Sequence, residues 1–217
     1  KKRRLSILLS IVMLLSLLPT TALAAGIYPD SVSVYNESGK IIGLSDGQYL
    51  AQNIDSSASS SYTSGSPYVA RYDKSTGTLF LKGYKGVGKQ GGIVATGDLN
   101  IKVENDSSFT TIKTDTYDLI GIQASKGKLN ISGSGKLTVT ANGSGDVYGI
   151  FAGEGVTISA PLDVTVGKNG TTENGPVYGI YTKSGAISLS GADKTITATG
   201  GKNLAYGVYA ADNSNIT

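Results

Sequence analysis

Apolar and polar residues alternate along most of the chain after Gly77, as they do in β-strands. One stretch, GIFAGEGVTISAPLDVTVG at 149–167, holds three such alternating segments, separated by Gly, Ser and Pro. Their apolar members are Ile150 and Ala152, then Val156 and Ile158, then Leu162, Val164 and Val166. Because turn residues separate the segments, the pattern predicts three short strands.

The residues that open this stretch return at a nearly constant interval. VYGIFA at 147–152 is followed by VYGIYT at 177–182 and AYGVYA at 205–210, and looser copies, QGGIVA at 90–95 and LIGIQA at 119–124, precede it. The glycines of these five copies lie 29, 28, 30 and 28 residues apart. A fixed period of this length is typical of stacked repeats.

Three strands in each period predict a coil that rises by one strand spacing per turn. Each strand then pairs in parallel with its copy in the next turn, and the alternating apolar residues fill a narrow interior. The crossover rule for parallel strands favours the right-handed coil. The predicted fold is therefore all-β: a right-handed parallel β-helix, or solenoid, with three strands per coil of about 28–30 residues.

The first residues have the layout of a secretory signal peptide. Four basic residues precede an apolar run at 5–18, and a small-x-small cleavage site follows at 22–24. A transmembrane anchor is the alternative, but the apolar run is short for a span of about 20 residues. We therefore assign residues 1–24 to a signal peptide that is cleaved on export.

The remaining chain divides into two parts. Residues 25–76 are expected to form a small N-terminal β-rich cap with a Ser-rich stretch at 56–66, which has little to bury and is predicted to be an exposed loop. Residues 77–217 form the predicted β-helix. Because no capping segment follows the last repeat, we expect this β-helix to be truncated and the complete protein to continue with further coils.

The composition narrows the classes of function. Without the four basic residues of the leader, 15 Lys and Arg face 16 Asp and Glu, so the net charge is about −1 and gives no sign of nucleic-acid binding. The chain has no His, which excludes a Ser-His-Asp triad, and no Cys, which with the missing His removes a structural zinc site. No cofactor is expected.

Several segments resemble a known group of proteins. They are LSDGQYLAQN (44–53), YDKSTGTLFLKGYKG (72–86), GGIVATGDLNI (91–101), GSGKLTVTANG (133–143) and YGIFAGEGVTIS (148–159). The chain thereby resembles exported β-helix repeat proteins of Gram-positive bacteria labelled "carbohydrate-binding domain-containing", and at the superfamily level it is similar to pectate-lyase-like and adhesin β-helices. The resemblance implies the fold and contact with glycans, but it supplies no catalytic motif to carry over.

Aromatic residues after the repeated Ile or Val are the candidate ligand-binding residues: Phe151, Tyr181 and Tyr209. If the preceding aliphatic residue points inward, strict alternation places these rings outward in one ladder. The same alternation places a second set inward or at a corner, namely Tyr148, Tyr178 and Tyr206, and turns the glycines between the two sets outward. A ring row beside bare backbone could bind the flat faces of sugars, or it could simply cover and stabilise the sheet.

The carboxylates give no clear catalytic constellation. Glu154 and Asp212 fall in one column two repeats apart, and Arg71 is the only arginine outside the leader.

We therefore expect no enzymatic activity, but a secreted or cell-wall-associated surface protein that binds a polysaccharide, a cell-surface glycan or another surface partner. It is not expected to bind nucleic acid, and it meets the membrane only through its cleaved signal peptide. The alternatives are a structural stalk of a larger adhesin and, less favoured, a polysaccharide lyase or hydrolase.

Overall fold

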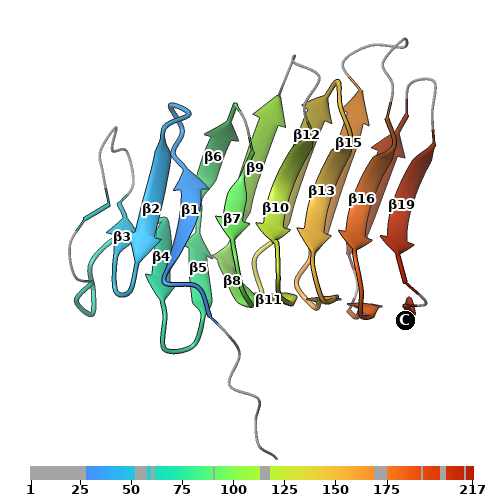
Figure 1. The fold of residues 1–217 in the computed structure, drawn as a ribbon. Coiled ribbons are helices and arrows are strands. Elements are labelled where there is room, and N and C mark those ends of the chain that lie inside the picture. Colours follow the sequence, from blue (N-terminus) through green and yellow to red (C-terminus); the bar gives the residue numbers. More distant parts are fainter. Residues whose placement is uncertain are drawn as a thin grey trace, which may run out of the picture.

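The computed structural model describes most of the chain after the leader. The described residues are 28–51, 58–59, 62–89, 91–112, 118–168, 175–191, 193–200, 204–212 and 214–217. The assigned signal peptide lies outside them. Within these ranges the regular elements are strands, and they form three sheets (Figure 1).

The three sheets have the following strand orders. The first is β19 (Ala205–Ala210), β16 (Val177–Thr182), β13 (Val147–Ala152), β10 (Leu119–Ala124), β7 (Ile93–Ala95), β1 (Ser31–Tyr35) and β2 (Ile41–Ser45). The second is β17 (Ile187–Leu189), β14 (Val156–Ile158), β11 (Leu129–Gly133), β8 (Leu99–Asn105), β5 (Thr78–Lys82), β4 (Ala70–Asp73) and β3 (Tyr49–Leu50). The third is β18 (Lys194–Thr199), β15 (Leu162–Lys168), β12 (Leu137–Gly143), β9 (Ser107–Ile112) and β6 (Lys85–Gly88).

From β5 onward the chain visits the second, third and first sheets in strict rotation. Each strand pairs in parallel with the strand one coil later, so that β10 pairs with β13 and β12 with β15. The structure confirms the predicted fold class, an all-β solenoid of about four turns. Its right-handed sense stays the prediction of the crossover rule.

The interior holds the alternating apolar residues that the sequence singled out. In the coil of β11, β12 and β13, the side chains of Leu129, Leu137, Val139 and Ile150 are fully shielded from solvent. Burying such a side chain stabilises the fold by roughly 1.5–3 kcal/mol. Since one coil offers only a few of them, the stacking of coils is what produces a continuous core.

The glycines of the first four repeats lie buried in the interior and not, as alternation predicted, on the outside, and Gly207 of the fifth is half-buried. Gly149 is buried, and a Cβ added there would lie 2.5 Å from Val164 Cγ1 and 2.6 Å from the carbonyl oxygen of Gly179. The strand pairing also omits this residue, which lies between two paired neighbours. A glycine at such a point allows two parts of the fold to approach closely. Here it lets the valines of the third sheet pack directly against the backbone of the first.

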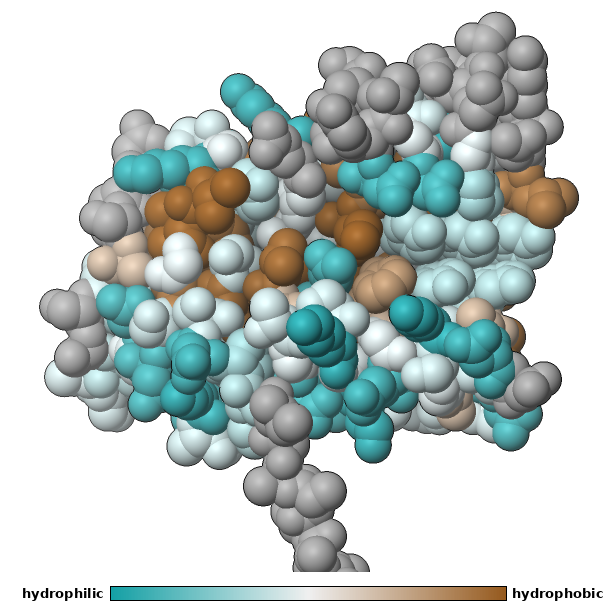
Figure 2. Space-filling model, in the orientation of Figure 1, coloured by the Kyte–Doolittle hydropathy of each residue, from teal (hydrophilic) through white to brown (hydrophobic). Residues whose placement is uncertain are grey.

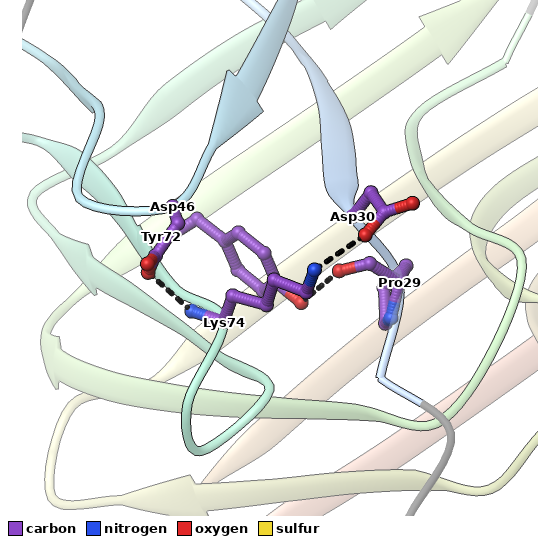
Figure 3. A network of polar contacts seen from close by, with 5 residues as sticks. All are labelled: Pro29, Asp30, Asp46, Tyr72 and Lys74. Atoms are coloured by element: carbon purple, nitrogen blue, oxygen red, sulfur yellow. Dashed lines mark hydrogen bonds and ion pairs between the residues drawn. The ribbon is translucent and has the colours of Figure 1, made fainter.

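The N-terminal strands pair differently from the coils. β1 pairs with β2, and β3 and β4 with their neighbours, in antiparallel fashion. Two buried tyrosines attach these strands: the hydroxyl of Tyr72 donates to the carbonyl oxygen of Pro29 at 2.6 Å, and that of Tyr84 to the carbonyl oxygen of Tyr35 at 2.5 Å. Lys74 adds an ion pair with Asp30 beside Tyr72 (Figure 3).

The Ser-rich stretch is more firmly attached than its composition predicted. Ser59 forms an isolated bridge with Tyr49, and Ala58 packs against the core. Tyr62 is half-buried, and its ring lies against Arg71. The prediction of an exposed loop is therefore wrong for Ala58, Ser59 and Tyr62, which contact the second sheet, whereas residues 63–65 are exposed as predicted. Residues 56–57 and 60–61 lie outside the described part.

Candidate functional site

The candidate surface is the outer face of the first sheet, where β13, β16 and β19 lie side by side (Figure 1). Figure 2 shows this face, with apolar side chains gathered toward the end that carries β2 and regular rows of pale side chains over the C-terminal coils. Each of the three strands has two half-buried or exposed rings. We call these six residues the aromatic surface: Tyr148, Phe151, Tyr178, Tyr181, Tyr206 and Tyr209.

The predicted ladder of Phe151, Tyr181 and Tyr209 is present. The rings of Phe151 and Tyr181 stack with centroids 5.4 Å apart and planes 14° from parallel, and those of Tyr181 and Tyr209 with centroids 5.7 Å apart and planes 4° from parallel. The register explains this column, because the three residues are direct partners in adjacent parallel strands. Like residues repeated in register must stack along the solenoid.

The prediction that the second set of tyrosines lies toward the interior or at a corner is wrong. The ring of Tyr148 lies 5.6 Å from that of Phe151 at 89°, so both lie on the outer face. The physical reason is the glycine between them: Gly149 and Ile150 both face the interior, which shifts the alternation by one residue. The rings that flank this glycine therefore emerge on the same side.

The second set forms a column of its own. Tyr148 stacks on Tyr178 with centroids 5.0 Å apart, and Tyr178 on Tyr206 with centroids 5.3 Å apart. Between the columns the rings meet at steep angles, as for Tyr178 and Tyr181, whose planes lie 63° apart. The surface is therefore twice as wide as the sequence predicted, with parallel stacking along each column and edge contacts between them.

The stacking decides how much of each ring a ligand could touch. Carbon atoms in contact lie about 3.5–4.0 Å apart, whereas the stacked centroids are 5.0–5.7 Å apart. The rings are therefore offset, in the arrangement that aromatic pairs prefer. Each neighbour covers part of a face, and a strip of ring with its edge and hydroxyl stays open.

Carboxylates lie at both ends of these strands. Asp118 and Asp146 precede β10 and β13, and the backbone N–H of Asp146 donates to Asp118 Oδ1 at 3.2 Å. Burial, and next the charge of Asp118, raise the pKa of Asp146, while Lys168 opposes the rise. The Tyr148 hydroxyl lies 3.5 Å from Asp146 Oδ2, which joins this acidic end to the aromatic surface.

The other end carries the acids noted in the sequence. Glu154 and Asp212 are exposed and follow β13 and β19. Between them lies Ser184, whose N–H donates to the carbonyl oxygen of Gly153, so the two acids are two rungs apart, about 9–10 Å at the usual strand spacing. Nowhere in the described residues do three potential metal ligands gather.

Sequence reasoning missed half of the aromatic surface and the contact of Asp146 with it. The signal was present, because Tyr148, Tyr178 and Tyr206 recur in the same column as regularly as the rings that were chosen. Strict alternation assigned them to the wrong side. A glycine inside a strand is a known sign of a bulge or a close approach, and it marks where alternation should be expected to fail.

No helix among the described residues has the length and apolar character that a membrane crossing requires.

The chain was also compared with known proteins. No protein-family model matches it, and neither a curated protein nor a solved structure does so.

Proposed function

We propose that this is an exported, non-catalytic protein that binds a glycan through the aromatic surface. The observation that carries the proposal is the pair of ring columns lying side by side on one open face. Tyrosine combines an apolar ring with a hydroxyl, which suits a ligand that presents both C–H faces and hydroxyl groups. A sugar unit does both.

The repeat of the surface favours a chain of sugars over a single one. Neighbouring rungs lie about 4.7–4.9 Å apart, so equivalent strips of ring recur along the solenoid at a constant interval. A linear polysaccharide lying along the columns would meet the same contact several times. Weak contacts of this kind add up when they are linked in one ligand.

The charges near the aromatic surface favour a neutral glycan there. Asp118 and Asp146 lie at one end with Lys168 close by, and Glu154 and Asp212 lie at the other with the exposed Lys126 and Lys183, so the two signs of charge nearly balance. Carboxylates accept hydrogen bonds from sugar hydroxyls, whereas they repel phosphates and other anions. The leader at 1–24 supports an extracellular or cell-wall location.

A structural stalk is the second candidate, and the stacking itself favours it. Tyr181 touches four other rings, those of Tyr148, Phe151, Tyr178 and Tyr209. Aromatic pairs contribute about 0.5–1.5 kcal/mol each beyond their buried area. The columns could therefore serve the rigidity of the solenoid alone, without a ligand.

The test is affinity electrophoresis of the mature protein through a panel of neutral polysaccharides. The comparison is a triple variant, Phe151→Ala, Tyr181→Ala and Tyr209→Ala. A matched control replaces three outward residues of the third sheet in neighbouring coils, Thr140→Ala, Thr165→Ala and Thr197→Ala, which form one column in register. We expect one polysaccharide to retard the wild type and the threonine variant but not the ring variant.

Circular dichroism and thermal unfolding must show that the ring variant is folded. If it is not, the milder Tyr209→Ala variant replaces it, because that ring lies at the end of its column and is 36% exposed. Equal retardation of the ring and threonine variants would contradict the proposal. Failure of every polysaccharide to retard the wild type would also contradict it and would favour the stalk.

A further inference from the structure

A second group of aromatic and charged residues lies on a different face, the outer side of the second sheet near the N-terminal strands. Arg71 on β4 pairs with Phe80 on β5, which pairs in turn with Lys102 on β8. These three side chains alternate outward from buried neighbours. Tyr62 and Tyr68, from the segment before β4, complete the group.

The guanidinium of Arg71 is held in place by rings. Its Cζ lies 4.1 Å from the ring centroid of Phe80, 4.5 Å from that of Tyr62 and 5.6 Å from that of Tyr68. Tyr62 and Tyr68 meet edge to face with centroids 5.5 Å apart. Rings that stack on a guanidinium restrict its rotation but do not use its hydrogen-bond donors. Tyr68 also accepts a hydrogen bond from Arg71, so Arg71 is preorganised and keeps its remaining donors for a ligand.

Further cations lie around Arg71, and neutralising partners are few. Lys82 lies 5.9 Å from the ring centroid of Tyr68, and Lys102 lies 5.8 Å from that of Phe80. None of the ion pairs among the described residues includes Arg71 or either lysine. Nε of Arg71 is buried and has no hydrogen-bond partner there. The nearby carboxylate, Glu104, accepts a hydrogen bond from the Tyr68 hydroxyl at 2.7 Å.

We propose that this group, the Arg71 cluster (Tyr62, Tyr68, Arg71, Phe80, Lys82 and Lys102), binds the carboxylate groups of an acidic glycan. A guanidinium presents two parallel N–H donors that match the two oxygens of a carboxylate. The lysines add attraction for the following acidic units of a chain, and the ring edges offer apolar contact to the sugar. The site is independent of the aromatic surface, whose nearly balanced charges favour a neutral ligand.

The probe is alginate, a polysaccharide with one carboxylate on each unit, and its control is alginate whose carboxylates are esterified. At about 0.15 M salt, where charge attraction acts only over a Debye length of about 8 Å, we expect alginate to retard the mature protein and the ester to leave it unretarded. Arg71→Gln should weaken binding at least about tenfold. Arg71→Lys should also weaken it, because an ammonium lacks the planar fork.

Two further variants keep the proposal testable if Arg71→Gln fails to fold. Lys102→Gln leaves the stacked arginine in place and is expected to weaken binding by a smaller factor, about two- to fivefold. Lys85→Gln removes the same charge from the exposed outer side of the third sheet, and its affinity should match the wild type. Equal losses for Lys102→Gln and Lys85→Gln would overturn the proposal, since they would show general charge attraction.

The nature of the partner is tested with two other polyanions. Equal affinity for dextran sulfate would overturn the assignment to carboxylates, and equal affinity for poly-glutamate would overturn the assignment to a glycan. The ring variant of the aromatic surface, Phe151→Ala with Tyr181→Ala and Tyr209→Ala, should bind alginate as the wild type does. Loss of alginate binding in that variant would overturn the independence of the two sites, whatever the neutral panel shows.

Discussion

At the residue scale, the same chemistry serves two purposes on this molecule. The rings of the aromatic surface stabilise one another along and across two columns, and they also leave strips of ring and hydroxyls open to solvent. On the second sheet, rings stack on a charge instead, and Arg71 is the group that they orient. Phe80 has Arg71 and Lys102 as its register partners, whereas each ring of the aromatic surface has another ring in register beside it.

Asp146 should make the stability of the fold depend on pH. Its pKa is raised above the ordinary value of 3.8, chiefly by burial and next by Asp118. The folded state therefore favours the protonated carboxyl group. The stability that this group contributes is fully present below pH 3.8, and it is lost as the pH rises through the raised pKa of the folded state. We expect the free energy of unfolding of Asp146→Asn, measured relative to that of the wild type, to increase as the pH rises from acidic to neutral.

Urea unfolding of both proteins at several pH values between 3.5 and 7.5 would measure this difference. Tyr148 lies against the same carboxylate, and burial raises the pKa of its hydroxyl far above this range. Asp98→Asn is the control, because that carboxylate accepts its hydrogen bond from the backbone N–H of a lysine, Lys128, and not from that of an acidic residue. If the free energies of unfolding of Asp146→Asn and the wild type differed by the same amount at every pH, the prediction would be contradicted.

At the element scale, the glycines of the repeat decide how closely the first and third sheets approach. The space beside Gly149 is filled by Val164, and the space beside Gly121 by Val139. A close-packed interior transmits the effect of even one added methyl group. The glycine column is thus a packing requirement of the first sheet, and the outward position of Tyr148 is its consequence.

Gly149→Ala should lower the free energy of unfolding by about 1–3 kcal/mol, as overpacking usually does. The added Cβ would lie 2.5 Å from Val164 Cγ1, 2.9 Å from Val166 Cγ1 and 2.6 Å from the Gly179 carbonyl oxygen, and backbone at that distance cannot yield cheaply. Gly43→Ala on β2 is the matched control, since an added Cβ there meets nothing within 4 Å. Chemical denaturation would compare the two, and equal stabilities would refute this account of the glycine column.

At the scale of the whole molecule, burial is uneven along the solenoid. Val139 and Val164 in the middle coils are fully buried, whereas the equivalent Ile196 on β18 is only partly buried, as is Val208 on β19. Strands in a solenoid are stabilised by their neighbouring coils. Within the described residues β18 and β19 pair with a strand on one side only, whereas β17 also forms a bridge with Ile216.

Hydrogen exchange should therefore be graded along the chain. In the 217-residue chain, we expect the backbone amides of β12 and β15 to exchange more slowly than those of β18 and β19, because local opening costs least where few apolar contacts are lost. Mass spectrometry of peptides from each coil would measure the rates. Equal protection in all coils would mean that the solenoid opens only as one cooperative unit, contrary to this expectation.

The fold could be predicted from the sequence because its signals are local and repeated. The alternation of Leu129 and Ile131 with polar residues, and its return one period later in Val156 and Ile158, determined the strands, their parallel pairing and the buried face. A two-residue periodicity specifies the face of a strand, and a fixed repeat length specifies its register. These two signals need no knowledge of distant contacts.

The sites depended on contacts that no local pattern contains. Only the tertiary structure decided that Gly149 faces Val164, and hence that Tyr148 joins Phe151 on the outside. It also brought Tyr62, from a segment predicted to be an exposed loop, against Arg71. Close approach between sheets and the attachment of a loop are properties of the assembled coils, so the sequence by itself determined the solenoid, and packing decided which side chains its surfaces present.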